Sequence, residues 1–72
     1  MDLASVMTLT INGESRGFEG VPDVAALVAA LGLDPRKVAV ERNLEIVPRS
    51  AYGRTPLADG DRIEIVHFIG GG

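Results

Sequence analysis

The sequence predicts an α+β fold in which a small mixed sheet of four to five strands packs on one main helix. Three observations predict it: strand-like alternation at both ends of the chain, one helical pattern between them, and two short strand-like runs after the helix. The 72 residues suffice for one small domain. A domain of this size buries only about 60% of its unfolded surface, so a deep, enclosed active site is not expected.

The first predicted element is a hairpin. Residues 7–11 alternate between apolar and polar side chains, which is the period-two pattern of a half-buried strand. Asn12 and Gly13 follow, and both accept the positive φ values of a tight turn. We therefore expect an antiparallel return strand over residues 15–18. Residues 1–6 lack the pattern, so the domain is expected to span 7–69 after a flexible extension.

The segment 22–31 changes to the helical period. Pro22 and Asp23 suit its first turn, Gly32 fits the position just past its end, and Pro35 blocks any continuation. Its apolar face would be too large to remain in water, so we expect it to cover a sheet. The side chains on that face are spaced three, four and seven residues apart: Val24, Leu27, Val28 and Leu31.

The second half of the chain alternates between short strands and turns. Residues 38–40 read as a buried strand and 46–47 as a short extended piece, whereas 49–56 read as a turn or irregular helix. Asp59-Gly60 forms a sharp turn signal before the terminal strand, 61–69. A helix between sequential strands implies a right-handed crossover, which brings the opening and later strands together under that helix.

Charge and composition exclude several classes of function. The net charge is −3, and the basic residues are scattered rather than gathered into the stripe that nucleic-acid binding requires. Without cysteine there is no thiolate for zinc and no thiol nucleophile. No apolar run approaches the roughly 20 residues of a membrane span. We expect a soluble, cytoplasmic protein, monomeric when free, with neither nucleic-acid nor membrane partners and no metal or cofactor of its own.

Other candidate chemistry in the sequence is sparse. Asp59 and Asp61 flank a glycine, but a calcium loop spreads its ligands over about a dozen residues, so a solvated turn is expected. Arg42 and Arg49 could pair with an acidic partner, but a role as surface charges is the expected one. The serines lie in no nucleophile motif and the glycines in no phosphate-binding fingerprint. The sequence therefore predicts no enzyme.

Alternation along the last strand suggests a docking surface. If Ile63 and Ile65 face the helix, Val66 and Phe68 lie on the opposite, outer face. Neighbouring exposed apolar side chains favour contact with a partner, although a bulge that tucks Phe68 against the body is an open alternative. His67 shares the parity of the core face and is expected to be a packed strand residue rather than a base or ligand.

Three glycines end the sequence: Gly70, Gly71 and Gly72. Glycine carries no Cβ, so an extended glycine run is slender enough for a channel that excludes other residues. At about 3.3 to 3.6 Å per residue, such a tail holds its terminal carboxylate roughly 10 Å beyond a folded body. We therefore expect a flexible tail over 70–72 whose end is accessible to a partner enzyme, the alternative being a frayed end.

Four features together resemble a known family: the segment 40–43 (VERN), the segment 45–49 (EIVPR), the turn 59–61 (DGD) and the ending 63–72 (IEIVHFIGGG). They resemble the ThiS family of sulfur carrier proteins of thiamine biosynthesis, which has a ubiquitin-like β-grasp fold. The resemblance covers residues 7–72, nearly the whole chain. A terminal Gly-Gly is shared with other carriers and modifiers, whereas the two longer segments resemble ThiS in particular.

The resemblance implies a chemistry at Gly72. A ThiF-like enzyme would use ATP and magnesium, which belong to that enzyme, to adenylate the terminal carboxylate. Sulfur from a persulfide donor would then convert it to a thiocarboxylate, and a ThiG-like thiazole synthase would receive that sulfur for the thiazole ring. Gly70 and Gly71 would form the tail, and Val66, Phe68 and Ile69 would contact the partners. The carrier would be a protein co-substrate rather than an enzyme.

Other functions fit the same features. A sulfur carrier for molybdopterin synthesis or tRNA thiolation would share fold, tail and activation and differ in the recipient. A protein-conjugating modifier would acylate lysines with the same carboxylate. A non-covalent ubiquitin-like interaction module would function without Gly71 and Gly72.

Overall fold

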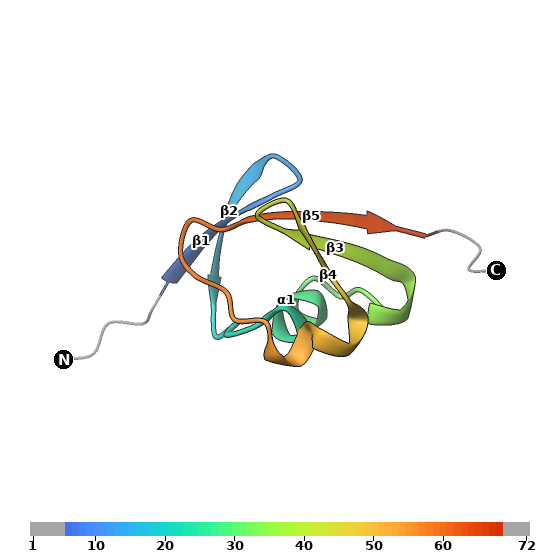
Figure 1. The fold of residues 1–72 in the computed structure, drawn as a ribbon. Coiled ribbons are helices and arrows are strands. Elements are labelled where there is room, and N and C mark those ends of the chain that lie inside the picture. The colour runs from blue at the N-terminus through green and yellow to red at the C-terminus, as the bar shows by residue number, and fades with distance from the viewer. Residues whose placement is uncertain (1–5, 69–72) are drawn as a thin grey trace.

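The computed structural model describes residues 6–68 (Figure 1), whereas the expected sites Ile69, Gly70, Gly71 and Gly72 lie outside the described residues. The α+β class and the mixed sheet on one main helix are confirmed. In chain order the elements are β1 (Val6–Ile11), β2 (Glu14–Glu19), α1 (Val24–Ala30), the 3₁₀ helix η1 (Pro35–Lys37), β3 (Val38–Arg42), β4 (Glu45–Val47), the 3₁₀ helix η2 (Arg49–Arg54) and β5 (Arg62–His67).

The last strand of the chain lies in the middle of the sheet. The strand order is β2-β1-β5-β3-β4. β5 runs parallel to β1, with Thr10 opposite Arg62, and antiparallel to β3. β1 with β2 and β3 with β4 form two antiparallel hairpins that flank β5 on either side (Figure 1). The opening and closing parts of the chain therefore meet at the centre of the fold.

The first hairpin turns at the residues that the sequence indicates. Asn12 and Gly13 have φ values of 50° and 86°, the left-handed conformation that a two-residue hairpin loop requires. β1 already begins at Val6, which pairs with Glu19 and which the sequence pattern placed with the extension. β2 likewise begins one residue earlier than expected, at Glu14.

The helix is shorter than its apolar pattern suggests. α1 covers residues 24–30 rather than 22–31 because Asp23 has an extended backbone and acts as the N-cap, accepting a hydrogen bond from the Ala26 amide at 2.8 Å. At the other end Leu31 is the C-cap, and Gly32 adopts φ +74° just past it, as expected. Among the described residues, no helix is long and apolar enough to cross a membrane.

The core lies between the sheet and a layer formed by α1 and η2, as Figure 1 shows. η2 occupies the stretch expected as a turn or irregular helix, and its Tyr52 hydroxyl donates a hydrogen bond to the Val38 carbonyl at 3.3 Å. The deepest side chains come from the sheet and α1 together: Leu9, Val24, Leu27, Val28, Val40 and Ile63. The opposite face of the sheet carries no described helix or strand layer.

The turn between β3 and β4 carries strain. Asn43 and Leu44 have φ values of 51° and 72°, and for leucine this left-handed conformation costs about 1–2 kcal/mol because its Cβ crowds the backbone. Leu44 is 74% exposed, so burial of its side chain offsets little of that cost.

We expect Leu44→Gly to raise the free energy of unfolding by about 0.5–1 kcal/mol, since glycine adopts this φ without strain. Urea unfolding followed by circular dichroism measures the change. Leu44→Ala is the matched control, because it shortens the exposed side chain but keeps the Cβ, and it should give no comparable gain. Equal stabilisation by both variants would attribute the effect to lost surface hydrophobicity instead.

Candidate functional site

The outer face of β5 presents the apolar side chains that sequence parity predicts. Val66 is 60% exposed and Phe68 is 48% exposed. Phe68 follows the last strand residue, and its amide donates to the Lys37 carbonyl at 2.8 Å, so the backbone stays beside β3. The open alternative, in which Phe68 tucks against the body, does not occur. Both side chains thus stand next to the point where the chain continues toward Gly72.

Ile46 is another exposed apolar side chain on this face of the sheet, two strands away from Val66, and sequence reasoning missed it. It lies opposite Glu41, and Glu41 lies opposite Glu64 on β5, so the three side chains form a row across the outer face of the sheet. Ile46 is 71% exposed. Its signal was available in the sequence, because the buried Val47 beside it fixes the parity of β4 and turns Ile46 outward.

His67 is exposed, so the expectation of a packed side chain is wrong. Its parity is that of the core face, but burial fades along that face, from Ile63, which is fully buried, through the half-buried Ile65 to His67 at the strand end. The core therefore does not reach the end of β5. Within residues 6–68, no three His, Cys, Asp or Glu side chains gather in a way that could hold a metal ion.

The side chain of Asn12 holds the second half of β5. Its Oδ1 accepts a hydrogen bond from the Ile65 amide at 2.7 Å, and its Nδ2 donates to the Ile65 carbonyl at 3.1 Å. The sequence pattern indicates this asparagine only as a turn residue. No local pattern indicates the second role, because the two residues are 53 positions apart.

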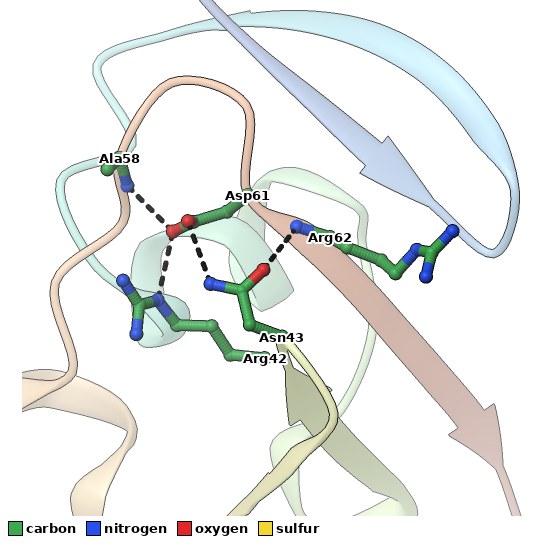
Figure 2. A network of polar contacts seen from close by, with 5 residues as sticks. All are labelled: Arg42, Asn43, Ala58, Asp61 and Arg62. Atoms are coloured by element: carbon green, nitrogen blue, oxygen red, sulfur yellow. Dashed lines mark hydrogen bonds and ion pairs between the residues drawn. The ribbon is translucent and has the colours of Figure 1, made fainter.

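A second asparagine holds the start of β5, as Figure 2 shows. The side-chain Oδ1 of Asn43 accepts a hydrogen bond from the Arg62 backbone amide at 2.9 Å. The backbone amide of Asn43 donates to the Arg62 carbonyl at 2.7 Å. Its Nδ2 donates to Asp61 Oδ1 at 3.0 Å. Asn43 and Asn12 thus play matching parts, each projecting from a hairpin turn onto the central strand.

Asp61 is the hub of this network and corrects two expectations. It is only 7% exposed instead of lying in a solvated turn, and Arg42 is its ion-pair partner at 2.9 Å instead of a plain surface charge. The Ala58 amide adds a third hydrogen bond at 2.8 Å (Figure 2). Burial raises the pKa of Asp61, but the hydrogen bonds and charge that the carboxylate receives outweigh burial and leave its pKa below the usual value. The buried carboxylate is therefore ionised and satisfied at neutral pH.

The described residues offer positioning rather than catalysis. The side chains of Asn12, Asn43 and Asp61 bond the backbone of β5 or the residues beside its start. The arrangement is that of a small α+β domain that holds its final strand at the centre of the sheet and presents an apolar outer surface beside the strand end. This defines a β-grasp domain of the ubiquitin-like class.

The sequence matches the ThiS family over residues 9–72, and the chain belongs to that family. It is 50% identical over 65 residues to the sulfur carrier protein ThiS of Bacillus subtilis, an alignment that covers 89% of this chain and 98% of that protein. The crystal structure of the thiamine biosynthesis protein ThiS from Geobacter metallireducens superposes with a TM-score of 0.78 at 38% identity, covering 92% of this chain and 100% of that one. The β-grasp fold expected from the resemblance is confirmed.

A longer relative contains a segment of the same kind. The thiazole synthase of Paramagnetospirillum magneticum is 61% identical over 66 residues, which are 92% of this chain but only 20% of that protein. The chain thus spans about a fifth of the length of this relative.

The Asp61 network predicts an acid-dependent loss of stability. We expect Asp61→Asn to lower the free energy of unfolding at pH 7 by about 1–3 kcal/mol, because charged hydrogen bonds to a buried group are lost. Since the pKa of Asp61 is lowered in the folded state, its contribution is present above the unfolded value of about 3.9 and is lost as the pH falls through the folded value.

Urea unfolding between pH 7 and pH 2 checks this prediction. The curves of wild type and Asp61→Asn should converge at acid pH. Asp59→Asn is the control, because the Asp59 carboxylate accepts one hydrogen bond, from the Thr8 amide, at an exposed site. A difference between wild type and Asp61→Asn that stays constant over the whole range would contradict the assignment.

Proposed function

We propose that this protein is a sulfur carrier of thiamine biosynthesis and that the carboxyl group of Gly72 is its reacting group. Membership of the ThiS family supports the proposal, together with the 50% identity to a protein named as a sulfur carrier over 98% of that protein's length. This full-length match is the observation that carries the proposal. The glycine run before Gly72 supplies the slender end that such chemistry needs.

The chemistry follows from the poor reactivity of a carboxylate. A carboxylate oxygen of Gly72 attacks the α-phosphorus of ATP on a ThiF-like enzyme, pyrophosphate leaves, and an acyl-adenylate forms. The outer sulfur of a persulfide then attacks the acyl carbon and AMP leaves. A thiol cleaves the remaining sulfur–sulfur bond by exchange, which leaves a thiocarboxylate on the carrier. ATP, magnesium and the persulfide belong to the partner enzymes, so the carrier is a co-substrate and not a catalyst.

The proposed recipient is a ThiG-like thiazole synthase, in which the sulfur enters the thiazole ring. The longer relative supports this choice, because a segment 61% identical to this chain is part of a protein named thiazole synthase. Two activities joined in one chain work at a high effective concentration, which favours partners that meet in the same reaction sequence.

The body is proposed to identify the carrier to these enzymes through the outer face of β5. Val66 and Phe68 are exposed there, and Ile69 follows them in the sequence. Clustered apolar side chains beside a reactive end favour docking, because their burial against a partner releases water while the end is being positioned.

Mass spectrometry tests the chemistry. Incubated with its adenylating enzyme, ATP, magnesium and a persulfide donor, the purified protein should gain about 16 Da as one oxygen is replaced by sulfur. Fragmentation should place the gain on Gly72. A variant lacking Gly71 and Gly72 is the control and should stay unchanged. No gain under conditions in which a known carrier reacts would refute the proposal, and lysine-linked adducts would indicate a conjugating modifier instead.

Charge substitutions test the docking surface. Val66→Glu and Phe68→Glu should each weaken binding to the adenylating enzyme by about tenfold or more, because a carboxylate is desolvated in an apolar contact. Isothermal calorimetry measures the affinity and circular dichroism verifies the fold. Thr8→Glu, an exposed site on the neighbouring strand β1, is the matched control. Variants that fold normally and bind like the wild type would remove Val66 and Phe68 from the interface.

A further inference from the structure

We propose that Asn12 is a positioning residue for the reacting end of the chain, acting through its two hydrogen bonds to Ile65. The inference rests on the proposed function, since it concerns the delivery of Gly72 to a partner enzyme. It adds a role for a residue at the far end of the sequence, in a turn that otherwise only connects β1 and β2.

The Asn12 side chain extends the sheet where β1 stops. The pairing of β1 with β5 ends with Ile11 opposite Ile63, because the chain turns away at the hairpin. The backbone amide of Asn12 still donates a hydrogen bond to the Ile63 carbonyl, at 2.9 Å. Its side-chain amide then bonds both backbone groups of Ile65, the double contact that two residues make in a hydrogen-bonded pair of an antiparallel ladder. The second half of β5 thereby gains a hydrogen-bonding neighbour that the strands alone do not supply.

Position 12 requires a positive φ and a side chain that both donates and accepts a hydrogen bond, and asparagine meets both requirements. Its backbone has a φ of 50°, which asparagine, aspartate and glycine tolerate best. Of these three residues only asparagine offers a side-chain donor and acceptor together, so aspartate could satisfy the Ile65 amide but not its carbonyl, and glycine could satisfy neither.

Hydrogen bonds matter here because apolar packing does not fix the strand end. Ile65 is half-buried and His67 is exposed, so side-chain burial weakens just where β5 approaches the tail. On the opposite edge β3 continues to pair, with Val38 opposite His67 and the Phe68 amide bonded to Lys37. Within residues 6–68, Ile65 is thus the last residue of β5 with a bonded neighbour on the hairpin side.

The orientation of β5 at Ile65 sets the point from which the chain runs on to Gly72. Gly72 lies seven residues further along the chain, which is up to about 25 Å in extended backbone. A turn of the strand end changes the position and direction from which the tail starts, and misplacements of about 1 Å can slow an enzymatic step markedly. Anchoring Ile65 therefore narrows the set of directions in which the reacting end leaves the body.

Asn43 provides a matched control, because it is the same residue type with nearly the same φ and also bonds the backbone of β5. Its contacts are to Arg62, at the start of the strand, and to Asp61. Loss of Asn43 should therefore destabilise the fold without releasing the end that leads to Gly72. Stability effects and positioning effects can thus be separated within one strand.

The test compares Asn12→Gly, Asn12→Asp and Asn43→Gly. With the adenylating enzyme, ATP and a persulfide donor, kcat for thiocarboxylate formation should fall about 5- to 10-fold in Asn12→Gly, with KM nearly unchanged because the docking surface remains. Asn12→Asp should recover part of the loss, since it keeps the bond to the Ile65 amide. Asn43→Gly should lower Tm at least as much as Asn12→Gly but leave kcat near that of the wild type.

Hydrogen exchange supplies a readout that is independent of the reaction. The Ile65 amide should lose protection by tenfold or more in Asn12→Gly, whereas the Ile63 amide should keep its protection relative to global unfolding. An unchanged kcat in Asn12→Gly, or an equal loss in Asn43→Gly, overturns the positioning role while leaving the proposed function standing. Failure of the wild type itself to acquire sulfur overturns the proposed function, and this inference with it.

Discussion

Hydrogen bonding of β5 on both of its edges is the constraint on which the rest of the structure depends. β5 is the last strand in the sequence and the middle one in the sheet, with β1 on one side and β3 on the other. The two hairpins do not pair with each other, so without β5 they would be separate two-stranded units, which are at best marginally stable in water. Its central Ile63 is also fully buried. Backbone pairing and core packing therefore both converge on this strand.

Polar side chains bond backbone groups of β5 that the neighbouring strands leave unpaired. β1 and β3 run in opposite directions and both end opposite Ile63, and in the turn after each strand an asparagine in the left-handed conformation reaches the β5 backbone. Asp61 adds a buried carboxylate that accepts hydrogen bonds from Arg42, Asn43 and the Ala58 amide. Among the described residues, no buried side-chain nitrogen or oxygen lacks a hydrogen-bond partner. The two asparagines and Asp61 thus serve the placement of one strand.

Sequence reasoning succeeded where the determinants are local. The Asn12-Gly13 turn and the helix with its Gly32 terminus follow from neighbouring residues alone, and the outward direction of Val66 follows from strict alternation in a strand. It failed where partners are remote. Asp61 was expected in a solvated turn because its hydrogen-bond partners Arg42, in β3, and Asn43, in the following turn, are 19 and 18 positions away in the sequence. His67 was expected to pack because parity carries no information on where the core ends. The candidate reacting end, Gly70 to Gly72, lies outside the described residues, and its assignment rests on the glycine run and the family resemblance.

The parallel pairing of β1 with β5 also has a kinetic consequence. Each hairpin is a local structure that closes over a short loop, whereas the contacts that seat β5 join residues as far as 53 positions apart. Closing so long a loop carries a large entropic cost before any contact repays it, and chains dominated by such contacts fold slowly for their length. The hairpins should consequently form early, with the edges of β1 and β3 that face β5 still unpaired, and the final strand should then insert between them and join both halves.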